Sequence, residues 1–126
     1  MSKTTINSSK APAPIGPYSQ AVVIRDTLYI SGQIAIDQSS GSFVNENISK
    51  ETEQVMTNLG YILEEGGFSF EDVVKCSIFI SNMDDFAEIN GVYGKYFTSN
   101  PPARETVEVS RLPKDVNVEI SCIAMK

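Results

Sequence analysis

A single long repeat of apolar residues, between residues 48 and 63, constrains the fold of this chain more than any other feature. The residues that share one face at helical spacing are Ile48, Thr52, Val55, Met56, Leu59, Ile62 and Leu63. Asn47 or Ser49 can cap the start of this helix, and Gly66-Gly67 can end it in the left-handed geometry that glycine tolerates. The helix must bury this face, so the sequence predicts that it packs on a sheet formed by the β-rich runs around it.

Five runs typical of strands lie on both sides of that helix. The first two are joined by a tight turn at Arg25-Asp26, and the second is interrupted by Ser31-Gly32-Gln33, after which residues 34–36 can continue it. The third has polar positions at Lys75 and Ser77, so it is not buried on both faces. The predicted strands are Ala21–Ile24, Leu28–Ile30, Val73–Ile80, Arg104–Val109 and Val116–Ala124.

A second helical pattern begins near Asp84 and cannot continue beyond Pro101-Pro102. Its apolar positions are Phe86, Ile89, Val92, Tyr93, Tyr96 and Phe97. The order of strands, helix, strand, helix and strands predicts a single domain over residues 1–126, with an α+β fold in which two helices cover one face of a mixed β-sheet. The other face keeps apolar residues, so we expect another subunit to bury it. These residues are Phe79, Val107, Val109 and Ile123.

The 126 residues include no histidine, which removes histidine bases, histidine metal ligands and the nucleophiles that histidine activates. We therefore expect no metal and no cofactor. The net charge is -6 and no two of the 10 basic residues are adjacent, so a nucleic-acid partner is disfavoured. Cys76 and Cys122 lie in apolar strand patterns and are interpreted as reduced core thiols. No apolar stretch is typical of a signal peptide or a membrane span, which favours a soluble, cytoplasmic protein.

Arg104 and Glu119 are the two charged residues whose positions stand out. Arg104 follows two prolines and an alanine, and a guanidinium held in this way suits a carboxylate; the alternative is an ordinary solvated or salt-bridged strand end. Glu119 lies in the middle of an apolar strand, where a charge needs a partner. We assume that the last two strands form a hairpin in which Val109 faces Val116. Thr106 then faces Glu119, with Arg104 one diagonal step away, in a patch that could also be a surface ion pair.

Weaker candidates lie elsewhere in the chain. Tyr18 can cover a site, although a loop anchor packed on the core is the simpler alternative. Ser31 and Gly32 break a strand, which indicates either a bulge or the close approach of a ligand to the backbone. Asn90 is polar among apolar helix positions and can equally be an exposed residue.

Several motifs follow one another along nearly the whole chain. They are Ala13-Pro14-Ile15-Gly16-Pro17-Tyr18-Ser19-Gln20, Ser31-Gly32-Gln33-Ile34, Asp85-Phe86-Ala87-Glu88-Ile89-Asn90, Pro102-Ala103-Arg104, Val107-Glu108-Val109, Arg111-Leu112-Pro113-Lys114-Asp115, Val118-Glu119-Ile120 and Ile123-Ala124. Together they resemble the reactive intermediate deaminase family, of the RidA or YjgF-like type. The resemblance implies a chorismate-mutase-like fold, assembled as a homotrimer with ligand clefts between subunits. It also implies cofactor-free hydrolysis of 2-imino acids, such as 2-iminobutanoate and 2-iminopropanoate, to 2-oxo acids and ammonia.

The resemblance also assigns roles to residues. Arg104 would bind the substrate carboxylate, and Glu119 would position the water that attacks the imine carbon. The residues that would line the cleft are Tyr18, Ser31, Gly32, Asn90 and Thr106. Thr106 stands where some members carry cysteine, and Ser121 where members often carry a second glutamate, which leaves the ligand preference open.

The same resemblance brings alternative functions. Relatives have been described as translation inhibitors or ribonucleases, which the acidic charge and the missing histidine disfavour. A non-enzymatic metabolite-binding or chaperone-like protein is the other alternative. Such a binder would need Arg104 alone, so the presence of Glu119 favours the enzyme.

Overall fold

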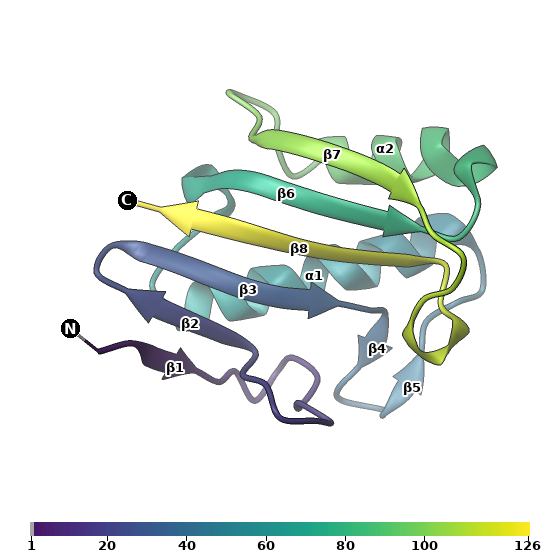
Figure 1. Ribbon diagram of the computed structural model, residues 1–126. Coiled ribbons are helices and arrows are strands. Elements are labelled where there is room, and N and C mark those ends of the chain that lie inside the picture. Colours follow the sequence, from purple (N-terminus) through teal and green to yellow (C-terminus); the bar gives the residue numbers. More distant parts are fainter. Residues whose placement is uncertain (1) are drawn as a thin grey trace.

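The computed structural model describes residues 2–126 and contains a six-stranded sheet with two helices on one face (Figure 1). The strand order is β1-β2-β3-β8-β6-β7, and neighbouring strands are antiparallel except β6 and β7. The strands are β1 (Thr4–Ile6), β2 (Ala21–Ile24), β3 (Thr27–Gln33), β6 (Val73–Ile80), β7 (Ala103–Glu108) and β8 (Val118–Met125), with a separate ribbon of β4 (Ile36–Asp37) and β5 (Ser42–Phe43). The helices are α1 (Ile48–Glu65) and α2 (Phe86–Gly94). The predicted α+β arrangement is confirmed.

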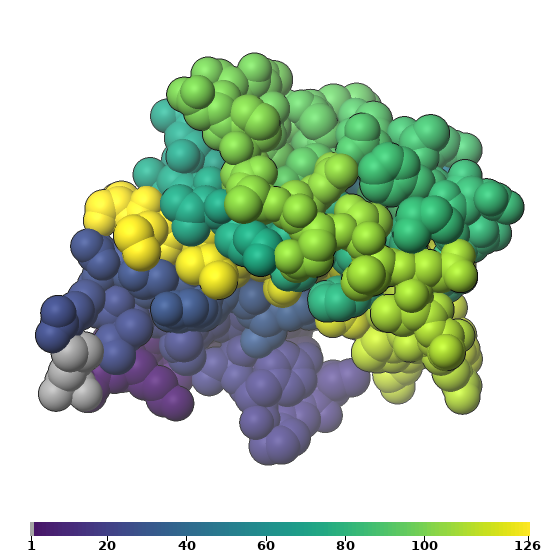
Figure 2. Space-filling view, turned by 45° about the horizontal axis from the view of Figure 1, so that its top comes forward, coloured from purple at the N-terminus to yellow at the C-terminus, as the bar shows by residue number. Residues whose placement is uncertain are grey.

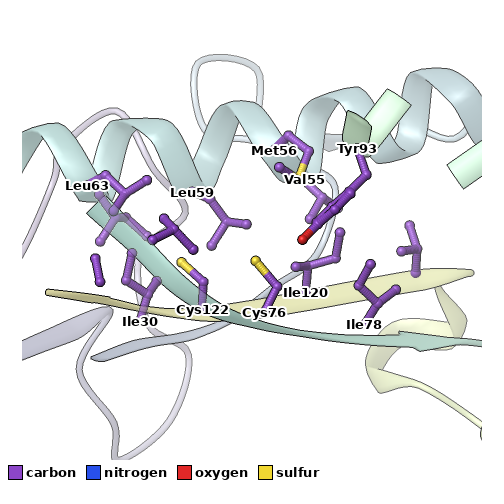
Figure 3. Packing of buried hydrophobic residues seen from close by; sticks show 14 of the residues in the cluster. Ile30, Val55, Met56, Leu59, Leu63, Cys76, Ile78, Tyr93, Ile120 and Cys122 are labelled. Atoms are coloured by element: carbon purple, nitrogen blue, oxygen red, sulfur yellow. The ribbon is translucent and has the colours of Figure 1, made fainter. Parts of the chain in front are cut away.

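Helix α1 is the predicted amphipathic helix. Its start is capped by Asn47, whose Oδ1 accepts a hydrogen bond of 2.8 Å from the backbone N of Lys50, and Gly67 turns the chain after its end at a φ of 82°. Its buried side chains lie on the middle of the sheet, above Cys76 and Cys122, which are free, buried and opposite each other on β6 and β8 (Figure 3). Within residues 2–126, neither helix is long and apolar enough to cross a membrane.

The second helix is shorter than its apolar pattern predicts. It ends at Gly94, a residue of low helix propensity, and Tyr96 and Phe97 lie beyond it. The rings of these two residues pack against Phe70, at centroid distances of 5.0 and 5.6 Å. Tyr96 and Phe97 are therefore apolar because they form an aromatic cluster with Phe70, not because they belong to the helix.

The predicted hairpin between the last two strands is wrong. β7 lies at the edge of the sheet, parallel to β6, and β8 lies between β3 and β6 (Figure 1). Val109 does not face Val116, because its backbone N donates a hydrogen bond of 2.8 Å to the carbonyl of Ile80, the last residue of β6. The burial of the strands explains the arrangement. Alternate residues of β8 are buried, as in a central strand, whereas β7 is polar and exposed, as suits an edge.

The face of the sheet opposite the helices, which we call the open face, is partly apolar in the single chain. Tyr29 and Val107 are 46% and 43% exposed there, and Phe79 and Ile123 are half-buried. Figure 2 shows the loop between β1 and β2, in violet, standing out at the lower edge of the view, with a notch between it and the yellow-green loop after β7. An apolar face of this kind is typical of a subunit interface.

A buried glutamate ties α1 to the start of β8. Glu51, in the first turn of α1, is 1% exposed, and its two carboxylate oxygens accept hydrogen bonds of 2.8 Å from the backbone N and the side-chain Nδ2 of Asn117. The carbonyl of Asn117 in turn accepts a hydrogen bond of 3.1 Å from the backbone N of Ser81, just after β6. These contacts join three elements two residues before Glu119.

Replacing Glu51 with alanine removes both acceptors of Asn117. We expect the free energy of unfolding, measured by urea denaturation, to fall by about 2–4 kcal/mol, because two hydrogen bonds to a buried charge are lost. Lys50→Ala is the matched control: it removes only the exposed pair with Glu46 and should cost less than about 0.5 kcal/mol. A loss from Glu51→Ala no larger than that of the control would show that these contacts do not hold β8.

Candidate functional site

Glu119 lies against the backbone of Gly32. The pairing of β3 with β8 shifts its register between Ile30 and Gln33, so the predicted interruption at Ser31-Gly32 is a bulge-like irregularity. A Cβ atom at residue 32 would lie 2.8 Å from Cδ of Glu119, closer than real side chains approach each other. Glycine therefore leaves the room that the carboxylate occupies.

A loop held by Gln20 brings Tyr18 beside Gly32. The Gln20 side chain is buried and hydrogen-bonds backbone atoms of residues 8–12. Tyr18 is 49% exposed and lines a small pocket together with Gly32. Ser31 is tied to the same loop, because its Oγ donates a hydrogen bond of 2.7 Å to a loop carbonyl. We call Tyr18, Ser31, Gly32 and Glu119 the Glu119 half-site.

The carboxylate of Glu119 is half-buried and uncompensated. Burial raises the pKa of Glu119, and within residues 2–126 no hydrogen-bond donor or cation offsets the lost hydration. A carboxylate with a raised pKa is a better proton acceptor than one in water. The Glu119 half-site can therefore hold a water molecule and take a proton from it.

Arg104 lies on β7 and points to the helix side of the sheet. Its Nη1 donates a hydrogen bond of 2.7 Å to Oδ1 of Asn90 on α2. The guanidinium carbon lies 5.0 Å from the ring centroid of Tyr93 and 5.6 Å from that of Phe86. None of the salt bridges among residues 2–126 involves Arg104, so its charge stays available to a ligand.

Thr106 points to the same side of β7 as Arg104, because it follows two residues later on the strand. Its Oγ1 is buried and has no hydrogen-bond partner within residues 2–126. A buried hydroxyl without a partner costs free energy, so the burial of this oxygen is not compensated within the described part of the chain. We call Asn90, Arg104 and Thr106 the Arg104 half-site.

The predicted patch of Arg104, Thr106 and Glu119 does not form within one chain. β6 separates the two strands: Arg104 pairs with Cys76, whose side chain is in the core, whereas Glu119 pairs with Phe79 on the open face. The two half-sites therefore lie on opposite faces of the sheet. They can act on one ligand only if two copies of the chain supply one half-site each.

The sequence pattern alone did not identify Phe86 and Tyr93 as neighbours of Arg104. Their apolar spacing predicts a core role for both, which accounts for only part of their contacts. Their spacing from Asn90 could have identified them, because residues three and four positions apart lie on the same face of a helix.

Comparison with known proteins gives consistent matches over the whole chain. Residues 8–126 match the family described as endoribonuclease L-PSP. The chain is 48% identical over 126 residues to a RutC family protein of Pyrococcus abyssi, covering 100% of this chain and 99% of that protein. It is 46% identical over 121 residues to a 2-iminobutanoate/2-iminopropanoate deaminase of Bos taurus, covering 96% and 88%. The crystal structure of E. coli TdcF with bound serine superposes with a TM-score of 0.94 at 35% identity and covers 98% of both chains.

The raised pKa of Glu119 predicts a pH-dependent cost to the fold. Below its ordinary pKa of 4.5 the carboxyl is protonated in the folded and the unfolded chain, so the cost is absent. As the pH rises through the higher pKa of the folded protein, ionisation favours the unfolded chain. Glu119→Gln should therefore raise the free energy of unfolding near neutral pH, and this gain should disappear in acid. Urea denaturation at both pH values measures it.

Glu105, also on the open face, provides the control of opposite sign. Hydrogen bonds from Ser77 and Lys75 lower the pKa of Glu105. Its ionised form therefore stabilises the folded chain above the ordinary pKa, and this contribution is lost as the pH falls through the lowered value. Glu105→Gln should thus lower stability near neutral pH. A gain from Glu119→Gln that is the same at both pH values would contradict a raised pKa.

Proposed function

This chain belongs to the endoribonuclease L-PSP family, as its resemblance to the reactive intermediate deaminases implies, and we propose that it hydrolyses 2-imino acids to 2-oxo acids and ammonia without a cofactor. The observation that carries the proposal is a pair of uncompensated charges: Arg104 without an acidic partner and the half-buried Glu119 without a cation, among residues 2–126. A relative with 46% identity bears the name of this activity, which supports the same reaction here.

Arg104 binds the carboxylate of the imino acid in this proposal. Asn90 engages Nη1 and so holds the guanidinium in place. The remaining N–H groups can form the two parallel hydrogen bonds that a carboxylate accepts. Thr106 lies two residues further along the same face of β7 and would border the bound carboxylate.

Glu119 activates the attacking water. The carboxylate accepts a hydrogen bond from the water and takes its proton as the oxygen adds to the C=N carbon. That proton passes to the nitrogen, which gives a carbinolamine with a hydroxyl and an amino group. Glu119 then moves the hydroxyl proton to the amino nitrogen as the carbon–nitrogen bond breaks, which releases ammonia and leaves the 2-oxo acid. Water and imine are the only reactants, so the protein has to orient them and needs no covalent nucleophile.

A homotrimer with a cleft between each pair of neighbours would join the half-sites. In a closed ring of identical subunits, the Arg104 half-site of one copy can meet the Glu119 half-site of the next, three times over. The same assembly would cover the partly apolar open face. The serine bound to E. coli TdcF supports a small-molecule ligand for this chain.

Ribonuclease activity is the alternative that the description of the family names. RNA cleavage needs a path of positive charge for the phosphates, whereas this chain has a net charge of -6 and separated basic residues. Carboxylate binding without catalysis is the second alternative. It would require the Arg104 half-site but not Glu119.

Single variants test the reaction. We expect Arg104→Ala to lower kcat/KM for freshly generated 2-iminobutanoate by at least about 100-fold, because two charge-assisted hydrogen bonds to the carboxylate are lost. Glu119→Gln should lower kcat but keep the binding of 2-oxobutanoate. Arg25→Gln, at the turn between β2 and β3, controls for the loss of positive charge. Ammonia release measures the rate. The proposal would be refuted if Arg104→Ala and Glu119→Gln both kept wild-type rates. It would also be refuted if the wild type cleaved RNA but hydrolysed no imine.

Mixing two inactive variants tests the shared cleft. When Arg104→Ala and Glu119→Gln chains are co-assembled in equal amounts, about a quarter of the clefts should combine an intact Arg104 with an intact Glu119. Activity should therefore return to about a quarter of the wild-type value. Native mass spectrometry shows whether mixed trimers form. Mixed trimers without recovered activity would mean that both residues act from one chain.

A further inference from the structure

The Arg104 guanidinium rests on uncharged groups. The rings of Tyr93 and Phe86 lie 5.0 and 5.6 Å from the guanidinium carbon, and the amide oxygen of Asn90 accepts its hydrogen bond at 2.7 Å. Aromatic faces attract a cation without removing its charge, and a neutral amide does the same. The three contacts restrain the side chain and leave its positive charge intact.

Acidic residues close to Arg104 and Asn90 in the chain have other partners. Glu105 forms a salt bridge of 2.9 Å with a lysine on the open face. Glu88 accepts a hydrogen bond of 3.1 Å from a serine of α1, and Glu108 accepts one of 2.7 Å from a backbone N–H. The surroundings of Arg104 thus separate it from the carboxylates that would otherwise neutralise it.

Tyr93 forms a rigid platform beneath the guanidinium. It is 5% exposed, and its hydroxyl points toward the sheet beside Cys76 (Figure 3). Its ring packs on Phe97 at a centroid distance of 4.8 Å, and Phe97 packs on Phe70 at 5.6 Å. Because the ring is locked in the core, the position of the arginine follows from the position of the ring.

We propose that Phe86, Asn90 and Tyr93 form an uncharged cradle that positions Arg104 and reserves its charge for the carboxylate of a ligand. Phe86 and Tyr93 are positioning residues, since they act through the arginine. The cradle rests on the proposed function only for the identity of the ligand. Its defining property is neutrality: a charged group in the cradle would compete with the ligand, whereas the loss of one neutral contact would only loosen the arginine.

Two variants of Asn90 separate charge competition from a structural role. Asn90→Asp places a carboxylate where the amide oxygen lies 2.7 Å from Nη1, while Asn90→Ala removes the contact without adding charge. We expect Asn90→Asp to weaken the binding of 2-oxobutanoate, measured by calorimetry at neutral pH, at least about tenfold more than Asn90→Ala does. A purely structural asparagine would make the two variants equal.

Two variants of Phe86 test the aromatic contact. Phe86→Leu keeps an apolar side chain but removes the ring, and should weaken 2-oxobutanoate binding by about three- to tenfold. Phe86→Tyr restores a ring and should bind more tightly than Phe86→Leu. In imine hydrolysis the change should appear in KM, with kcat within about twofold of the wild type, because Glu119 is untouched. Phe43→Leu, at an exposed aromatic of β5, is the control.

The outcomes keep the cradle and the reaction distinct. If the wild type hydrolyses no imine but Asn90→Asp still binds 2-oxobutanoate far more weakly than Asn90→Ala, the cradle stands and the proposed reaction falls. If Asn90→Asp and Asn90→Ala are equal, or Phe86→Leu binds as tightly as the wild type, the cradle is refuted. The absence of any 2-oxobutanoate binding by the wild type also refutes it.

Discussion

The burial of one face of α1 against the middle of the sheet is the interaction on which the rest of the structure depends. Met56, Leu59, Ile62 and Leu63 are at most 1% exposed, and each contributes about 1.5–3 kcal/mol by leaving water. This packing occupies the helix side of β3, β8 and β6 and leaves their other side uncovered. The same packing that forms the core of the chain therefore also leaves the partly apolar open face exposed.

This division of the sheet also keeps opposite charges apart. An arginine and a glutamate on neighbouring strands of one face form a cross-strand ion pair and satisfy each other. Here Arg104 rests against α2, whereas Glu119 lies beside Gly32 on the open face. The two charges cannot neutralise each other within one chain, so each remains available to a ligand. The predicted hairpin would have produced a closed internal pair.

Local patterns predicted both helices and the five longer strands but not β1 or β5, and they did not predict how the strands pair. The spacing from Ile48 to Leu63 identified α1, and the bounds Val73–Ile80 match β6, because both signals come from neighbouring residues. The strand that pairs with β7 depends on which strand occupies the centre of the sheet. The polar composition of Arg104–Val109 is typical of an edge strand, but the predicted hairpin did not take it into account. Arg104 and Glu119 emerged from position and resemblance. Their placement on opposite faces required the register of three strands.

The place of β8 at the centre of the sheet has a consequence for the order of synthesis. This strand is the last of the sheet to be synthesised, yet β3 and β6 meet only through it. Until residues 118–125 are synthesised, the inner edges of β3 and β6 have no partner strand. The apolar face of α1 also lacks the central strand against which it packs. The sheet is therefore complete only after residues 118–125 have been added, and a chain that stops short of Val118 lacks the strand that joins its two halves.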